Sequence, residues 1–143
     1  STPEARSEYA KRALAYYLKA LKFDPESAET HNNLGLMLLN SGNTEKALSH
    51  FDQAVSLQPD KGYYIANLGY VQFKLKKFDI AQKNLNKALQ LDSTLYAAHE
   101  TLGDIAFEKK DVGIALERWQ TIPVKIMRGE LRKKIENAKK AIH

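Results

Sequence analysis

The stretch HNNLG at residues 31–35 returns in altered form as IANLG at 65–69 and as HETLG at 99–103. Each copy ends on a Leu-Gly pair, and the three glycines, Gly35, Gly69 and Gly103, lie 34 residues apart. Self-similarity at a fixed interval of this size is typical of proteins built from stacked structural units. The sequence therefore predicts a repeat protein.

Other positions keep the same register along the chain. A large apolar residue recurs at Tyr17, Phe51, Leu85 and Trp119, and alanine recurs at Ala13, Ala47, Ala81 and Ala115. A third column contains Ala20, Ala54 and Ala88 and ends on Ile122, while Pro25 aligns with Pro59. So many columns in one register are not expected by chance, which strengthens the prediction of repeats.

Each unit is predicted to contain two helices. In EKALSHFDQAVSL at 45–57 the apolar residues fall at helical spacing on one face. The preceding AETHNNLGLMLLNSG at 28–42 is predicted as a helix that Gly42 ends. The recurring Gly and Ala positions let two antiparallel helices approach closely, and the large residue at Phe51, Leu85 or Trp119 fills the space beyond them. Pro25 and Pro59 then stop the second helix of a unit.

The predicted organisation is one array over residues 1–143. It begins with an N-terminal helix that forms half a repeat (1–27), continues with repeats at 28–61 and 62–95 and an incomplete repeat at 96–122, and ends with a basic capping helix (123–143). The break at Ile122-Pro123 predicts a short second helix in the last unit. In the capping helix, Leu131, Ile135, Ala138 and Ile142 share one side, which suits them to cover the end of a solenoid.

The order Leu-Gly, Ala, large residue, Ala, Pro at this period resembles the tetratricopeptide repeat family, over roughly residues 8–122. The resemblance implies an all-α, right-handed superhelical solenoid of helical hairpins. It also implies a non-catalytic role in which the first helices line a concave groove that binds an extended peptide or a helix of a partner protein. Two features depart from the family pattern: His31, Ile65 and His99 stand where a bulky residue, often Trp, is common, and Ser93 replaces the terminal proline of the middle unit.

Composition sets few limits on where the protein acts. The chain is 43% hydrophobic and 27% charged, as in ordinary folded proteins, and has no apolar run of membrane-span length and no signal-peptide pattern. The absence of cysteine excludes disulfides but suits cytoplasm and periplasm equally, so cytoplasm is only the default expectation. Because the chain opens on Ser1 without a methionine, we expect that it has been processed or excised from a longer protein.

The sequence shows no arrangement of residues that would support catalysis. There is no cysteine, no glycine-rich phosphate loop and no helical His pair at metal-ligand spacing, so no metal, no cofactor and no enzymatic activity are predicted. His31 and His99 are equivalent positions two units apart and are interpreted as half-buried structural residues. Trp119 is likewise interpreted as the core equivalent of Phe51.

The predicted binding residues share one face of each first helix, at the spacing i, i+4, i+7 and i+11. They are Asn33, Leu36 and Asn40 in the first unit, Tyr63, Asn67, Tyr70 and Lys74 in the second, and Thr101, Asp104 and Glu108 with the nearby Glu100 in the third. An amide side chain can both donate to and accept from a peptide backbone. Asn33, Asn67 and Thr101 are therefore similar to the asparagine ladders that hold extended peptides in superhelical members of this family.

The predicted partner is a protein segment with two kinds of side chain. Tyr63 and Tyr70 favour an apolar or aromatic residue opposite the second unit. The acidic third unit favours Lys or Arg. Of the basic and amide positions with which some members of this family bind the acidic C-termini of heat-shock chaperones, only Asn67 is matched, so that mode is not expected.

The sequence leaves two other interpretations open. The formal charge of +5 lies entirely in residues 125–143, where seven Lys and Arg outnumber Glu130 and Glu136. That basic helix could contact the phosphates of a nucleic acid, although it has no aromatic residues for stacking. Self-association through the ends of the array is the third interpretation.

Overall fold

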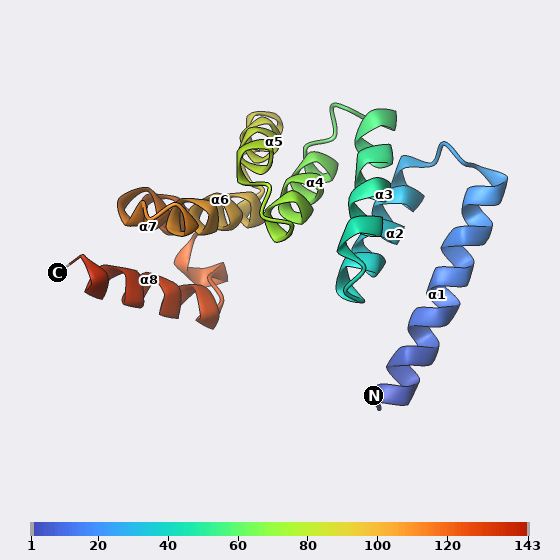
Figure 1. The fold of residues 1–143 in the computed structure, drawn as a ribbon, viewed down its shortest axis with the longest axis horizontal. Helices are drawn as coiled ribbons and strands as arrows, with labels where there is room; N and C mark the ends of the chain where they lie inside the picture. Colours follow the sequence, from blue (N-terminus) through green and yellow to red (C-terminus); the bar gives the residue numbers. More distant parts are fainter. Residues whose placement is uncertain (1, 143) are drawn as a thin grey trace.

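The computed structural model describes residues 2–142 and contains only helices and their connections over that range (Figure 1). The helices are α1 (Pro3–Phe23), α2 (Ala28–Asn40), α3 (Thr44–Leu57), α4 (Gly62–Lys74), α5 (Phe78–Leu91), α6 (Tyr96–Glu108), α7 (Val112–Gln120), the 3₁₀ turn η1 (Val124–Ile126) and α8 (Gly129–Ala141). Ser1 and His143, the outer limits of the predicted array, lie outside the described residues. The prediction of an all-α solenoid of helical hairpins is confirmed.

The hairpins α2–α3, α4–α5 and α6–α7 close around the three Leu-Gly glycines. A Cβ atom placed on Gly35 would lie 2.7 Å from the ring of Phe51, and one on Gly103 would lie 2.4 Å from the ring of Trp119. Real Cβ atoms do not approach other atoms this closely, so any larger residue would push the two helices apart. The glycines therefore recur because the large residue of the second helix packs directly against the backbone of the first.

The turn between the two helices of a unit uses one backbone conformation three times. Gly42 has a φ of +85°, and the residues 34 and 68 positions later, Lys76 and Lys110, have φ values of 59° and 68°. Gly42 thus ends the first helix as predicted. Glycine adopts this left-handed conformation without strain, whereas lysine does so at a cost. The turn geometry is accordingly set by the hairpin and not by the residue at this position.

Among the helices described, α1, α2 and α7 begin at a side chain that accepts a hydrogen bond from the first turn. The hydroxyl of Thr2 accepts from the Ala5 N–H at the start of α1, and Ser27 does the same for Thr30 at the start of α2. Asp111 accepts from the Ile114 N–H at the start of α7. That helix has nine residues, against 14 in α3 and α5, because the chain turns at Ile122-Pro123. The prediction of a short last helix is confirmed.

The core runs from unit to unit. Ala81, Leu85 and Ala88 of α5 are fully buried and pack with Ile65 of the preceding helix and Leu102 of the following unit. At the end of the row, Leu131, Ile135 and Ala138 of α8 are buried with Trp119 and Ile122. At the other end, α1 contains no buried residue. Among residues 2–142, no helix has the length and hydrophobicity needed to cross a membrane.

Candidate interaction groove on the first helices

The first helices carry an exposed aromatic surface at the middle of the array. Tyr63 and Tyr70 on α4 are 46% and 41% exposed, and Phe107 on α6 is 45% exposed. The rings of Tyr70 and Phe73 lie 6.4 Å apart, and those of Phe107 and Trp119 lie 5.7 Å apart. These side chains stand on a rigid scaffold and remain open to solvent, as anchors of a recognition surface do.

A hollow of about 370 Å³ adjoins this aromatic surface. Phe73, Phe107 and Trp119 supply its apolar wall, and Asp104, Glu108, Lys134 and Asn137 supply its polar wall. Trp119 is 1% exposed, and its indole N–H donates both to the carboxylate of Asp104 at 3.1 Å and to the carbonyl of Glu100 at 3.2 Å. The hollow therefore combines apolar walls with a fixed polar edge.

Two cations in and just before α8 pair with two acidic residues of the third unit, Glu100 and Asp104. Lys134 donates to both carboxylate oxygens of Asp104 at 3.0 and 3.1 Å and lies 3.7 Å from Glu100. Arg128 makes a second pair with Glu100 at 3.1 Å. Burial nevertheless raises the pKa of Asp104, because desolvation outweighs the opposing effects of Lys134 and of the Trp119 indole. Glu100 and Asp104, predicted as groove residues, thus already have cations beside them.

The three polar side chains predicted to line the groove as a row, Asn33, Asn67 and Thr101, are not equally available to a ligand. Asn67 donates to Asn32 of α2 at 2.8 Å, so it joins two first helices. Thr101 is buried, and its hydroxyl donates to the carbonyl of Ala97 in its own helix. Asn33 is half-buried and has no side-chain hydrogen bond to another residue of the range 2–142.

The remaining predicted residues divide between two places. Lys74 and Glu108 are exposed at the ends of α4 and α6, and Glu108 lines the hollow beside Phe107. Asn33, Leu36 and Asn40 instead line a separate groove between α1 and α2. The structure therefore does not place all predicted residues on one continuous binding surface.

His31 of α2 and His50 of α3 stack on each other, with ring centroids 5.4 Å apart. His31 is 8% exposed, and its Nε2 lies 2.9 Å from the carbonyl oxygen of Pro25, which can only accept. His31 therefore donates from Nε2 when neutral, and its Nδ1 accepts from Nδ1 of His50 at 3.1 Å. Burial, with the nearby His31, lowers the pKa of His50. Within residues 2–142, no group of three or more His, Cys, Asp or Glu side chains could hold a metal ion.

Sequence reasoning did not foresee the contribution of Arg128 and Lys134. The sequence contained a signal for this contact. A capping helix packs on the last unit of an array, so the acidic first helix of that unit, α6, and the basic α8 are expected to lie close together. The conformation of the turn at residues 121–128, which decides where α8 lies, could not be predicted from the sequence.

Comparisons with known proteins agree with this fold. Models of the tetratricopeptide repeat match residues 16–49 and 63–95. Protein O-mannosyl-transferase TMTC3 of Mus musculus is 32% identical over 94 residues, which are 66% of this chain and 9% of that protein. The chain thus spans about a tenth of the length of that curated relative.

Two solved structures show the same architecture. The crystal structure of MamA has a TM-score of 0.80 at 24% identity and covers 96% of this chain and 82% of that chain. The first tetratricopeptide domain of Spaghetti, solved bound to an HSP90 peptide, has a TM-score of 0.74 at 18% identity and covers 83% of this chain and 95% of that one. Sequence register, hairpin packing and these matches lead to one conclusion: the chain belongs to the tetratricopeptide repeat family.

Proposed function

We propose that this chain is a protein-interaction module that binds a segment of a partner protein on the first helices of its second and third units. The observation that carries the proposal is the set of exposed aromatic side chains on α4 and α6, Tyr63, Tyr70 and Phe107, of which Phe107 lines a hollow together with Phe73. When a partner covers exposed aromatic side chains, their apolar surface is removed from water, which favours binding. These side chains also lose little conformational freedom. The Spaghetti domain, which shares this fold, was solved with a peptide bound.

The expected ligand follows from the chemistry of the surface. An apolar or aromatic side chain of the partner would enter the hollow between Phe73 and Phe107. A basic side chain next to it would meet Glu108, which is exposed and makes no ion pair with another residue of the range 2–142. Glu100 and Asp104 would contribute less, because Arg128 and Lys134 already compensate their charge.

Nucleic acid binding through α8 has less support. Of the basic residues in and next to this helix, Arg128 and Lys134 pair with carboxylates and Arg132 donates to the carbonyl of Val124. Lys133, Lys139 and Lys140 are exposed, but single Lys side chains on a solvated face are ordinary in a capping helix. This alternative predicts steep salt dependence, which the following experiment also measures.

The test begins with peptides selected from a random phage-displayed library against the full chain. A selected peptide should perturb the amide NMR signals of α4 and α6, and the double variant Tyr63→Ala/Tyr70→Ala should weaken its binding at least about ten-fold. Tyr16→Ala is the matched control, because Tyr16 is exposed on α1 away from this surface. Equal weakening by the control, or binding that single-stranded DNA competes away, would contradict the proposal.

A further inference from the structure

A separate hollow, of about 200 Å³, lies between the second and third units. It is lined by Gln82 of α5, by Leu102, Ile105 and Ala106 of α6, and by Ile114 and Arg118 of α7. By helical spacing, these α6 residues lie on the face opposite to Asp104 and Phe107, which line the hollow next to the exposed aromatic side chains. The two hollows are therefore independent sites.

The equivalent place one unit earlier is filled by a leucine. Leu48 of α3 packs on the apolar cluster that contains Leu68 and Val71 of α4. In the register of 34 residues, Leu68 and Val71 correspond to Leu102 and Ile105. The first pair of units therefore shows that an aliphatic side chain fits on these positions.

Two differences between the units leave the later place open. Gln82 stands at the position of Leu48, and its amide oxygen accepts from Lys109 at 3.2 Å, so its side chain stays at the rim. Ala106 stands at the position of Gln72 and supplies only a methyl group. The hollow thus results from the residues of the second and third units themselves.

Arg118 lacks the partner that its repeat position has in both earlier units. Nδ1 of His50 lies 3.1 Å from Nδ1 of His31, and Asn84 donates to Gln72 at 2.8 Å. In the third unit an alanine replaces Gln72 and cannot accept. Arg118 is half-buried, and it forms no ion pair or side-chain hydrogen bond with another residue of the range 2–142.

The histidine of the third unit does not bind this guanidinium either. His99 corresponds to His31, and its buried Nδ1 has no hydrogen-bond partner among the residues described. Burial and the nearby charge of Arg118 both lower the pKa of His99, so the two groups lie close together without a bond. Half-buried cations are normally paired, and the planar fork of a guanidinium matches a carboxylate. Its donors are available to a ligand.

The other charged groups of the lining are already engaged. Lys109 pairs with Asp79 at 2.9 Å. The carboxylate of Asp111 accepts from the N–H of Ile114 at 3.1 Å at the start of α7. The charge that a ligand meets in this hollow is therefore that of Arg118, and it favours an anion.

We propose that this hollow binds a segment of a partner protein in which a branched aliphatic residue is followed by Asp or Glu. The aliphatic side chain lies on Leu102 and Ile105, as Leu48 does on their equivalents. The carboxylate accepts from Arg118. Ile114 and Arg118 are four residues apart on α7 and are neighbours on its surface, so adjacent side chains of one segment reach both.

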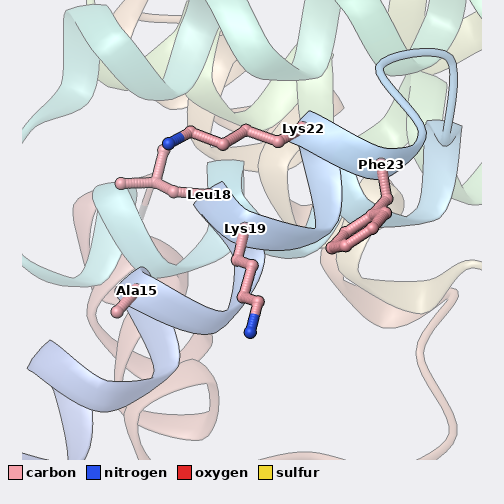
Figure 2. Close-up of a pocket in the computed structure, with 5 residues that line it drawn as sticks. All are labelled: Ala15, Leu18, Lys19, Lys22 and Phe23. Carbon is pink, nitrogen blue, oxygen red and sulfur yellow. The ribbon is translucent and has the colours of Figure 1, made fainter.

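A hollow on α1 does not support a similar inference. Figure 2 shows Leu18 and Phe23 with Lys19 and Lys22 around it, and every residue that lines it belongs to this one helix. A side chain placed there meets no opposing wall. The hollow beside Arg118 has walls from three helices and a filled equivalent in the preceding pair of units.

The test uses the full chain labelled with ¹⁵N and the dipeptide acetyl-Leu-Asp-amide, in which blocked ends leave the side-chain carboxylate as the charged group. We expect saturable amide shifts at Leu102, Ile105 and Ile114, with a dissociation constant in the millimolar range, as a ligand of this size allows. Acetyl-Leu-Asn-amide and acetyl-Ala-Asp-amide should each bind about five-fold more weakly, since one lacks the charge and the other the apolar group.

Variants of the protein separate the two contacts. Arg118→Asn should remove the preference for Asp over Asn in the dipeptide. Ile114→Ser should weaken binding about five-fold. Ile80→Ser is the matched control, because Ile80 has the same repeat position and similar exposure, 49% against 48%, and does not line the hollow. Gln82→Leu/Ala106→Gln introduces the residues of the preceding units and should abolish binding while the chain still unfolds cooperatively.

Four results would overturn the proposal. The first is equal affinity for the Asp and Asn dipeptides. The second is a set of shifts confined to Tyr70 and Phe107, which would place the ligand in the groove on α4 and α6 and leave that proposal standing. The third is tighter binding of acetyl-leucine, which would assign the hollow to a chain end with a free carboxylate. The fourth is a dimer in sedimentation velocity that Ile114→Ser dissociates and Ile80→Ser does not, which would assign it to a second copy.

Discussion

The two ends of the solenoid differ in how they are finished (Figure 1). At the C-terminal end, α8 buries Leu131, Ile135 and Ala138 against the last hairpin and supplies cations to its carboxylates. At the N-terminal end, α1 has no buried residue, and Tyr9 and Tyr16 are 77% and 69% exposed. The last hairpin is covered by α8, whereas α1 leaves large side chains exposed to solvent.

The difference shows that residues at the same repeat position do not contribute equally to the free energy of unfolding. Tyr17 and Trp119 occupy the same repeat position, yet Trp119 is 1% exposed and hydrogen-bonded whereas Tyr17 is half-buried. In a stacked array each helix is stabilised by its neighbours, so the contribution of a residue to stability depends on how many helices pack against it. The covered end should therefore contribute more to stability than the open end.

The largest effect is expected at Trp119. Trp119→Ala should lower the free energy of unfolding by about 3–5 kcal/mol, because it leaves a cavity and removes the donor to Asp104. Tyr17→Ala at the open end should cost about 1 kcal/mol, since much of its ring already contacts water. Urea unfolding followed by circular dichroism measures both. Similar losses for the two variants would contradict the contrast between the ends.

The next effect concerns the glycine against Trp119. Gly103→Ala should cost about 1–3 kcal/mol, because the added Cβ would lie 2.4 Å from the indole ring. Gly129→Ala in α8 is the matched control, since a Cβ there would meet nothing within 4 Å. We expect its stability to change little or to rise slightly. The prediction fails if thermal unfolding gives Gly103→Ala the same midpoint as the control.

A smaller effect is expected from the cation that pairs with Asp104. Lys134→Met should cost about 1 kcal/mol at pH 7, because Asp104 keeps its desolvation and loses its nearest compensating charge. Its pKa should rise further above the ordinary value of 3.8. As the pH falls below the pKa of Asp104 in the variant, the difference from the parent protein should shrink, and it should disappear below the pKa of Asp104 in the parent, where the carboxyl group is neutral in both proteins.

Lys133→Met provides the control for this variant, since Lys133 is exposed and forms no ion pair with the other residues described. Urea titrations at pH 7 and at pH 4 would compare the two. A cost at Lys134 that persists unchanged at low pH would show that packing of the lysine stem, and not its charge, is responsible.

The smallest effect is expected in the hairpin next to the open end. The pKa of His50 is lowered from 6.5, so below pH 6.5 the unfolded chain binds a proton that the folded chain does not. Stability from this group should be complete above pH 6.5 and should fall as the pH drops toward the lowered pKa. His50→Asn should remove part of this acid sensitivity, because asparagine does not bind a proton in this pH range. The asparagine amide can still donate to Nδ1 of His31, so the hydrogen bond is kept.

The equivalent position in the next unit is Asn84, which supports the choice of asparagine. The pKa of His99 is also lowered by burial, so some acid sensitivity should remain in the variant. An NMR titration of the His50 ring together with urea unfolding between pH 7.5 and 5 would measure the change. An unaltered pH profile in the variant would assign the sensitivity to other groups.

Much of the fold was predictable because the same physical constraint acts in each unit. Gly35, Gly69 and Gly103 each lie against one large side chain, so spacing alone indicated the hairpins. Gly42 indicated the turn, whereas Lys76 and Lys110 adopt the same left-handed conformation without a sequence signal. The repeat register thus predicts more than the local propensity of single residues.

The candidate site was less predictable, because a residue on the correct face of a helix can still be engaged by a neighbour. Tyr63 and Tyr70 are exposed on the face that helical spacing indicated. Thr101 lies on that face too, but it is buried and bonds within its own helix. Helical spacing gives the direction of a side chain, and only the adjacent helices decide whether a ligand can reach it.

By itself, the sequence determined the helical hairpins, their period and their stacking into a solenoid, because close packing at Leu-Gly positions is a local requirement that each unit repeats. The tertiary structure alone decided how the ends are finished. It placed Lys134 of α8 and Arg128, the residue before α8, beside Asp104 and Glu100, and it left Tyr17 and Asn33 lining a groove between α1 and α2. These outcomes depend on the turn after α7 and on how α1 packs on α2, which are relations between whole elements and not properties of any one repeat.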